Sequence, residues 1–367
     1  MRITQLQISD LRLFADLSLR LAPGINFITG ANGAGKTSLL EAMHLLGYGR
    51  SFRGGSRDTL IRHGRERLQV FARWQTETGE RRTGLTRSDS DWQAKLDGQR
   101  LPTLGELHRA CAVICFEPGS HELLAGAAEQ RRRYLDWALF HVEPDFLSAW
   151  RRYQRALRQR NSLLRASARN TAEYLPWEQE MASTAHRIDV LREQQLSRSA
   201  SAATPLLSFF LAELGEPDWR YRRGWSKTHD FADLLASNRE RDLRLGYSFS
   251  GPHRADWQLR FENLPEAAPL SRGQEKLAAL ACVLAQVDVL KLAGHEAPLV
   301  LLDDLASELD REHQARVWRQ LRESGVQVVA TGTERPPSLP GEWVDALFHV
   351  ERQGDTATLK PHPGVSA

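Results

Sequence analysis

The feature that most constrains this chain is the stretch from Gly30 to Thr37, which reads G-A-N-G-A-G-K-T. It fits the phosphate-binding pattern G-x-x-x-x-G-K-[ST] at every fixed position. The apolar run that ends in residues 25–28 predicts a strand before the loop, and residues 38–42 predict a helix whose N-terminus faces the anion. The alternative is a chance glycine-rich loop, but strand, loop and helix together favour a nucleotide site.

The residue types in this loop suit a nucleotide that is bound with Mg²⁺. Glycines let backbone N–H groups wrap a phosphate at little steric cost, the lysine reaches the terminal phosphates, and the threonine ligates the metal. The predicted nucleotide-binding residues are Gly30, Ala31, Asn32, Gly33, Ala34, Gly35, Lys36, Thr37 and Ser38.

Composition narrows the class of protein. A chain of 367 residues suggests about two domains. The longest apolar run, residues 277–285, is far shorter than the roughly 18 residues that a membrane span needs, and the N-terminus alternates like a strand of the mature protein. We therefore expect a cytoplasmic protein with no membrane partner. Cys111, Cys115 and Cys282 have no His at metal-site spacing, which predicts buried reduced thiols.

Apolar patterns predict an α/β fold with a second sheet. Residues 1–28 read as two short strands with a turn at 22–24, and residues 68–74 and 92–96 alternate like strands of an antiparallel sheet. Residues 112–116 form a continuous apolar run, which is typical of a buried strand in the main sheet.

From about residue 121 the pattern becomes helical. Apolar stripes over 146–164 and 177–191 predict two antiparallel helices only a few nanometres long. Pro205 is expected to end or kink the second helix, and strands resume near Arg220 and Trp257.

The second half supplies partners for the phosphate-binding loop. Residues 299–302 predict a strand that delivers Asp303 and Asp304 at its C-terminal end, where ligands bind in open α/β sheets. Asp303 suits Mg²⁺, held together with Thr37, and Asp304 is placed to polarise the attacking water, so Asp304 and Lys36 are the candidate catalytic residues. Surface charge is the alternative, and the pairing with the loop favours the functional interpretation.

A further segment precedes the apolar helix predicted at 277–290. It resembles the ABC-type signature, and its residues Ser271, Arg272, Gly273 and Gln274 would grip the γ-phosphate that the other protomer binds. The same residues could simply form a serine N-cap. The sequence S-E-L-D at 307–310, just after the aspartate pair, favours the dimer interpretation.

Over essentially its whole length the chain resembles the RecF family, bacterial recombination-mediator ATPases related to the heads of SMC proteins. The residues that carry the resemblance are Leu11-Arg12, 32–37, 40–42, 50–53, Asp58, 131–136, 251–254, 271–276 and 302–310. The resemblance implies an ABC-type ATPase head of a mixed parallel sheet and an antiparallel sheet lobe, formed by 1–120 and 220–367, with a short helical arm inserted at 121–219.

The resemblance also implies a function. It implies ATP and Mg²⁺ as cofactors, an ATP-dependent homodimer on double-stranded DNA and at single/double-strand junctions, and weak DNA-stimulated ATP hydrolysis. The implied partners are RecR and RecO, with RecA loaded at gaps during replication, recombinational repair and the SOS response.

The family pattern also bears on Arg12, on Thr331 and on the segment after Pro118. Arg12 joins the nucleotide site through the resemblance. Thr331, after an apolar strand, is a candidate γ-phosphate sensor or a plain β-branched strand residue. The segment after Pro118 departs from the family pattern, so no glutamine-loop equivalent is assigned.

Residues 151–165 contain six arginines and no acidic residue. Arg151, Arg152, Arg155 and Arg158 are candidate DNA contacts, because such a helix face fits a phosphate track. A solvated helix face with arginine stems over apolar neighbours fits equally well.

Two other functions remain open at this point. An ABC transporter ATP-binding subunit would explain the nucleotide motifs, but the long separation of Lys36 from Ser271 and the inserted basic helices speak against it. A clamp that binds ATP without hydrolysing it conflicts with the intact Asp303-Asp304 pair.

Overall fold

The computed structural model describes residues 1–53, 60–88, 91–168, 170–265 and 268–361 and divides into two compact units. Unit 1 comprises Met1–Ser120 and Leu290–Ala367, and unit 2 comprises His121–Val289. Among the described residues, no helix combines the length and the apolar character that crossing a membrane would require.

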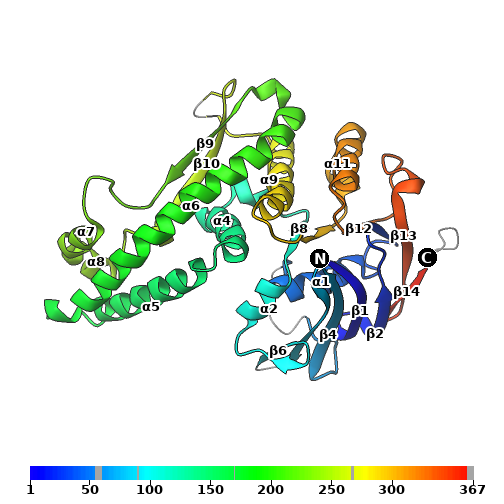
Figure 1. Cartoon of the computed structure of the whole chain (residues 1–367), viewed down its shortest axis with the longest axis horizontal. Helices are drawn as coiled ribbons and strands as arrows, with labels where there is room; N and C mark the ends of the chain where they lie inside the picture. The colour runs from blue at the N-terminus through cyan, green and yellow to red at the C-terminus, as the bar shows by residue number, and fades with distance from the viewer. Residues whose placement is uncertain (54–59, 89–90, 169, 266–267, 362–367) are drawn as a thin grey trace. The chain divides into compact units, whose positions relative to one another are not determined.

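Unit 1 contains a mixed sheet that is largely parallel. Its strands are β3 (Ile25–Thr29), β8 (Val113–Phe116), β11 (Leu299–Leu302), β12 (Val328–Gly332), β13 (Val344–Gln353) and β14 (Thr356–Pro361). The strand order is β14-β13-β3-β12-β11-β8, and only β14 pairs antiparallel among these described strands (Figure 1). Strands β3, β11 and β12 are buried throughout, which explains their continuous apolar sequences.

An antiparallel sheet forms the other layer of unit 1. Its strands are β1 (Arg2–Leu11), β2 (Phe14–Arg20), β4 (Arg67–Thr76), β5 (Gly79–Ser88), β6 (Trp92–Leu96) and β7 (Gln99–Arg100), in the order β2-β1-β4-β5-β6-β7. The strands predicted at 68–74 and 92–96 are confirmed. The prediction of two strands over residues 1–28 was wrong, because a tight turn at Arg12 and Leu13 splits the first into the hairpin β1–β2 before β3.

The helices of unit 1 are α1 (Lys36–Tyr48), α2 (Leu104–Ala110), α10 (Leu305–Glu308) and α11 (Arg311–Ser324), with a 3₁₀ turn at Gly341–Trp343. Helix α1 is buried on nearly every side. Its apolar side chains share one core with both sheets, as Leu39, Ile3 and Leu301 illustrate. The two sheets and α1 therefore fold as one body that holds the start of α1 in place.

Unit 2 is mainly helical. Its helices are α3 (Glu122–Ala125), α4 (Ala128–Val142), α5 (Phe146–Arg165), α6 (Leu175–Phe210), α7 (Phe231–Ser237), α8 (Arg239–Leu245) and α9 (Arg272–Leu292), whose last residues pass into unit 1. It also contains the antiparallel strands β9 (Pro217–Arg222) and β10 (Asp256–Phe261), with 3₁₀ turns at Thr171–Glu173, Ala212–Leu214 and Pro252–Arg254.

The antiparallel helical hairpin predicted in unit 2 is confirmed by α5 and α6, which lie side by side (Figure 1). Arg152 pairs with Glu180 at 2.6 Å, and Asp145 lies 3.8 Å from Arg187, so the residue numbers run in opposite directions along the two helices. Helix α6 continues through Pro205 to Phe210, so Pro205 does not end it. Burial of the apolar side chains of the last turn outweighs the one hydrogen bond that proline cannot make.

Residues 220–289 were assigned from sequence to the ATPase head, but they group with the helical unit. Strand β10 pairs along its whole length with β9, and the Trp257 ring packs on Tyr134 of α4. The boundary predicted at residue 120 coincides with the division between the units. That residues 220–289 function as part of the ATPase head stays a prediction.

The interior of unit 2 contains a charged cluster around Arg160, which is fully buried. Its guanidinium donates to Glu178 (3.1 Å), Asp242 (2.8 Å), the Ser248 hydroxyl (2.7 Å) and the Leu235 carbonyl (3.0 Å). Arg160 therefore ties α5 to α6, α7 and α8. It was counted in the basic face of residues 151–165, and this was wrong, because the side chain points inward.

We expect Arg160→Ala to destabilise unit 2 by about 3–5 kcal/mol, because it removes the buried cation that Asp242 and Glu178 share and leaves Glu178 with only its ion pair to Arg239. Arg155→Ala, at an exposed position of the same helix, is the matched control and should change stability by less than about 0.5 kcal/mol. Hydrogen exchange of the α5 and α6 amides measures the local effect. Equal protection in the two variants would contradict the structural role of Arg160.

Candidate nucleotide-binding site

The phosphate-binding loop follows β3 in the interior of the mixed sheet and ends at Thr37, in the first turn of α1. Gly30 has φ 153°, and a Cβ there would lie 2.5 Å from the carbonyl oxygen of Val350. Gly35 has φ 115° at the N-cap of α1. A side chain is disfavoured at both positions, so the glycines predicted at the ends of the loop are required by its backbone.

Lys36 lies at the start of α1 and is largely buried. Its Nζ donates to the carbonyl oxygens of Gly30 (2.7 Å) and Ala31 (3.0 Å), so the loop itself orients the ammonium group. Burial lowers the pKa of Lys36 from its usual value, and the charges of Asp304 and Asp303 oppose this shift. The ammonium group therefore lies near two carboxylates in a site of reduced solvation, which favours binding of a polyanion such as a triphosphate.

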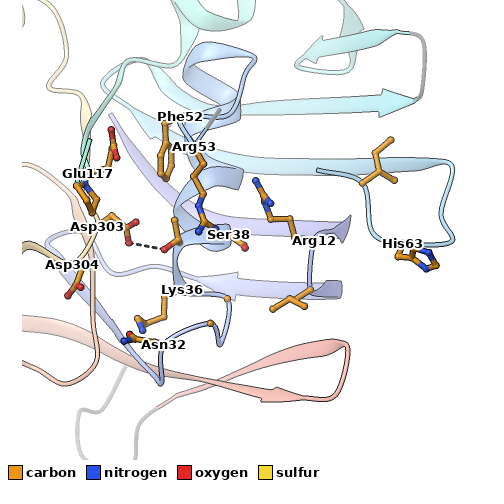
Figure 2. A pocket seen from close by; sticks show the side chains of 16 residues that line it. Arg12, Asn32, Lys36, Ser38, Phe52, Arg53, His63, Glu117, Asp303 and Asp304 are labelled. Carbon is orange, nitrogen blue, oxygen red and sulfur yellow. Dashed lines mark hydrogen bonds between the residues drawn. The ribbon is translucent and has the colours of Figure 1, made fainter. Parts of the chain in front are cut away.

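Asp303 accepts hydrogen bonds from two threonines that lie far apart in the chain. Thr331 Oγ1 donates to Asp303 Oδ1 at 2.7 Å. Thr37 Oγ1 donates to the same oxygen at 3.2 Å, and this second bond is the dashed line in Figure 2. Burial raises the pKa of Asp303, and the hydrogen bonds from the two threonines counteract it. The arrangement juxtaposes a carboxylate and a hydroxyl, oxygen ligands of the kind that Mg²⁺ prefers.

The donor set fits Mg²⁺ shared with a nucleotide. Among the described residues there is no group of three or more His, Cys, Asp or Glu side chains able to hold a metal ion. Mg²⁺ is usually bound through one or two carboxylates plus substrate phosphates, and Asp303 with the Thr37 hydroxyl offers oxygen ligands of this kind. Thr37 and Asp303 are therefore the residues of this chain that would hold it.

Asp304 follows directly at the N-cap of α10 and has φ 52°, a left-handed conformation that non-glycine residues rarely adopt. Its backbone N–H donates to Thr331 Oγ1 at 3.1 Å. Thr331 thus bridges the two aspartates and stabilises the turn between them. The strand role expected for Thr331 is confirmed, and its role as a phosphate sensor stays a prediction.

Arg12 reaches the site from the β1–β2 turn. Its guanidinium forms a two-point ion pair with Glu41, which is fully buried on α1, and one of the two contacts measures 2.8 Å. The Ser51 hydroxyl donates to the same carboxylate. Glu41 therefore positions the Arg12 guanidinium at the rim of the site.

These groups surround one cavity of about 870 Å³, which is large enough for a nucleotide (Figure 2). The predicted residues that line it are Arg12, Asn32, Gly33, Gly35, Lys36, Thr37, Ser38, Asp303 and Asp304. Gly30, Ala31, Ala34 and Thr331 are not among the lining residues. The carbonyls of Gly30 and the exposed Ala31 hold Lys36, Ala34 is buried in the loop, and Thr331 is buried at the aspartate turn.

Sequence reasoning did not assign several residues that also line the cavity, namely Leu13, Phe52, Arg53, Ile61, His63, Glu117 and Pro118. Glu117 could have been found, because it follows β8, which pairs in parallel with β11 and ends beside Leu302. Side chains that follow neighbouring parallel strands meet at one edge of a sheet. Asp58, which contributed to the family resemblance, lies outside the described residues.

The predicted signature residues Ser271, Arg272 and Gly273 are exposed at the start of α9 in unit 2. Ser271 Oγ accepts from Gln274 N at 3.3 Å, and Gln274 Oε1 accepts from Ser271 N at 2.9 Å. This reciprocal pair is a capping box, so the N-cap interpretation is confirmed. The contact with the nucleotide of another protomer stays a prediction.

The predicted DNA contacts Arg151, Arg152, Arg155 and Arg158 are exposed on α5. Arg152 is engaged with Glu180 through two contacts, at 2.6 and 2.9 Å. Within the described part of the chain, Arg155 and Arg158 form no ion pair with a carboxylate. These two arginines are therefore the stronger candidates for phosphate contacts.

Comparisons with known proteins agree with this architecture. The family model described as RecF/RecN/SMC N terminal domain matches residues 2–353. The DNA replication and repair protein RecF of Stenotrophomonas maltophilia (strain R551-3) is 46% identical over 358 residues, covering 96% of this chain and 98% of the relative. The protein of the same name from Shewanella sp. (strain W3-18-1) is 37% identical over 360 residues, covering 96% and 98%.

Solved structures show the same fold. The recombination mediator protein RecF-ATP in the RecFOR pathway superimposes with a TM-score of 0.88 at 23% identity, covering 98% of this chain and 97% of that one. An SMC head bound to the C-terminal winged-helix domain of ScpA gives a TM-score of 0.61 at 14% identity, covering 99% and 98%. The fold is thus that of an ABC-type ATPase head, as predicted.

We expect Asp303→Asn to abolish Mg²⁺-dependent nucleotide binding and to stabilise the nucleotide-free protein by about 0.5–2 kcal/mol. The amide keeps an oxygen for Thr37 and Thr331 but removes a buried charge. Because folding raises the pKa of Asp303, the ionised group destabilises the fold at neutral pH, and this penalty disappears as the pH falls below the unfolded-state pKa.

The stability effect is measured by the unfolding midpoints of both proteins at pH 7 and at acidic pH. The binding effect is measured by nucleotide titrations in Mg²⁺ and in EDTA. The stability gain should shrink in acid. A variant that is less stable than wild type at pH 7 would contradict this account of the Asp303 charge.

Proposed function

This chain belongs to the RecF family of the RecF/RecN/SMC proteins, and we propose that it is an ATP-dependent DNA-binding repair protein that dimerises on ATP. Its curated relatives carry the name DNA replication and repair protein, so a transporter subunit is not favoured. We further propose weak, DNA-stimulated ATP hydrolysis and cooperation with RecR, RecO and RecA at gapped DNA.

One observation carries the proposal: Thr37 and Asp303 make contact although they are 266 positions apart in the chain. The contact joins the phosphate-binding loop to the strand end that delivers both aspartates. Such a site needs a nucleotide phosphate and a divalent cation to complete its coordination.

The residues divide the chemistry among them. The loop N–H groups and Lys36 bind and orient the phosphates, and Thr37 with Asp303 would hold Mg²⁺, which neutralises charge on the phosphoryl oxygens. Asp304 orients the attacking water and accepts its proton at the carboxylate. Ser271 and the N–H groups that begin α9 complete the site of a partner protomer by donating to its γ-phosphate.

We expect the wild-type protein to form a dimer in ATP and Mg²⁺ but not in ADP, because only ATP carries the γ-phosphate that joins the protomers. Ser271→Arg should keep ATP affinity within about twofold and lose the dimer. Light scattering with each nucleotide, with and without gapped DNA, measures the mass. Loss of ATP affinity by the monomeric variant would show that Ser271 acts on the nucleotide of its own chain.

Asp304→Asn should bind ATP and dimerise normally but hydrolyse ATP about 100-fold more slowly, because the amide cannot accept the proton of the water. DNA should then dissociate from the variant more slowly than from wild type. Phosphate release and DNA dissociation in ATP are the two measurements. Normal turnover, or failure to dimerise, would assign the water to another carboxylate such as Glu117.

A further inference from the structure

A short segment of unit 2 exposes three large apolar side chains at alternating positions. Leu245, Tyr247 and Phe249 are 42%, 38% and 48% exposed. Single exposed apolar residues are normal, but three within five positions indicate a surface that contacts something. The segment begins at Leu245, the last residue of α8, and ends before the 3₁₀ turn Pro252–Arg254; none of the three residues lines the nucleotide cavity.

The backbone beneath these exposed rings is held by buried polar groups. Ser248 N and Oγ both donate to Asn161 Oδ1 at 2.8 Å, and the buried Arg160 donates to Ser248 Oγ. The backbone N–H of Phe249 donates to Asp242 at 3.2 Å. The Ser248 side chain is thus fastened to α5 and the Phe249 backbone to α8, while the two rings remain exposed.

The motif Gly251-Pro252-His253-Arg254 fastens the other end of the segment. His253 is hydrogen-bonded through Nε2 to the Ser248 carbonyl (2.9 Å) and through Nδ1 to the Tyr153 hydroxyl (2.6 Å). The buried Arg192 donates to the Pro252 carbonyl at 2.6 Å. Rigid presentation of exposed rings reduces the entropy cost of binding a ligand, so the motif preorganises a binding surface.

Arginines surround the two rings. The Arg241 guanidinium lies over Phe249 at 4.3 Å from the ring centroid, and that of Arg254 lies over Tyr247 at 5.2 Å. The side chain of Arg165, at the end of α5, passes close to Gly246. At 100° per residue, Arg158 and Arg165 project from α5 within about 20° of each other, next to Asn161, which anchors the segment.

We propose that these residues form a surface for single-stranded DNA, in which Tyr247 and Phe249 stack on unpaired bases and Arg158, Arg165, Arg241 and Arg254 contact phosphates. Aromatic rings beside separate cations are the features that bind single strands without reading sequence. Arg158 and Arg165 lie about 10 Å apart along α5, a distance that matches a few successive phosphates better than one acidic side chain of a protein.

This surface deepens the proposed DNA binding and rests on it. It supplies a reason for recognising a single/double-strand junction, because a fully paired duplex offers no unstacked base to the rings. The phosphate contacts of Arg155 on the same helix face serve duplex and single strand alike. The rings are therefore the part of unit 2 that distinguishes the two.

The test uses the full-length protein with ATP and Mg²⁺ and the double variant Tyr247→Leu, Phe249→Leu. Leucine keeps apolar bulk but removes the stacking ring, so single-stranded and gapped DNA should bind at least about tenfold more weakly, and blunt duplex within twofold of wild type. The fluorescence of a 2-aminopurine base placed in the single strand should be quenched on binding to the wild-type protein but not on binding to the variant. Leu175→Ala, which alters an exposed apolar residue on α6, is the control and should behave as wild type.

Arg158→Ala with Arg165→Ala adds an independent readout, because each lost single-strand contact should reduce the log–log salt slope by roughly 0.7. Unchanged single-strand affinity in the leucine variant overturns the inference, as does an equal loss on duplex and single strand. Loss of binding to an acidic protein with DNA binding intact also overturns it and assigns the surface to that protein. Failure of the wild-type protein to bind any DNA in ATP would instead refute the proposed function.

Discussion

The parallel pairing of β3, β12 and β11 is the constraint on which the site depends. Strand β12 pairs with β3 on one side and with β11 on the other, so the ends of all three strands lie at one edge of the sheet. The phosphate-binding loop, Thr331 and the aspartate pair leave the sheet at that edge. No local sequence preference could bring Thr37 and Asp303 together, and only the long-range register of three buried strands does so.

Several charged side chains are buried at that edge of the sheet. Asp303 is buried, and Lys36 is held by loop carbonyls. At the far rim, the Arg12–Glu41 pair buries another carboxylate on α1. Buried charges of this kind contribute little net stability and are costly to leave unpaired, so we attribute their presence to the proposed binding of phosphate and Mg²⁺. The large shared core of unit 1 provides the rigidity that keeps them in place.

The sequence predicted the parts of the structure that have strong local patterns. The loop, its flanking strand and helix, the aspartate-bearing strand and the α5–α6 hairpin were all found. Strand β5 was missed because two of its buried positions, Thr83 and Arg87, are polar and break the expected apolar alternation. Thr83 can be buried because its hydroxyl accepts a hydrogen bond from the indole N–H of Trp74 at 2.8 Å. The inward direction of Arg160 depends on tertiary contacts with α6, α7 and α8, so residue type and spacing could not reveal it.

The capping role of Ser271 is compatible with the phosphate contact that we propose for it. A serine hydroxyl has one donor and two acceptor positions. As an N-cap, Ser271 Oγ uses an acceptor position for the Gln274 N–H, and Gln274 returns a bond to the Ser271 N–H. The hydroxyl proton remains to donate to a phosphate, and the capping box holds the oxygen steady at the positive end of the α9 dipole. The capping box therefore leaves Ser271 able to make the proposed contact with a phosphate.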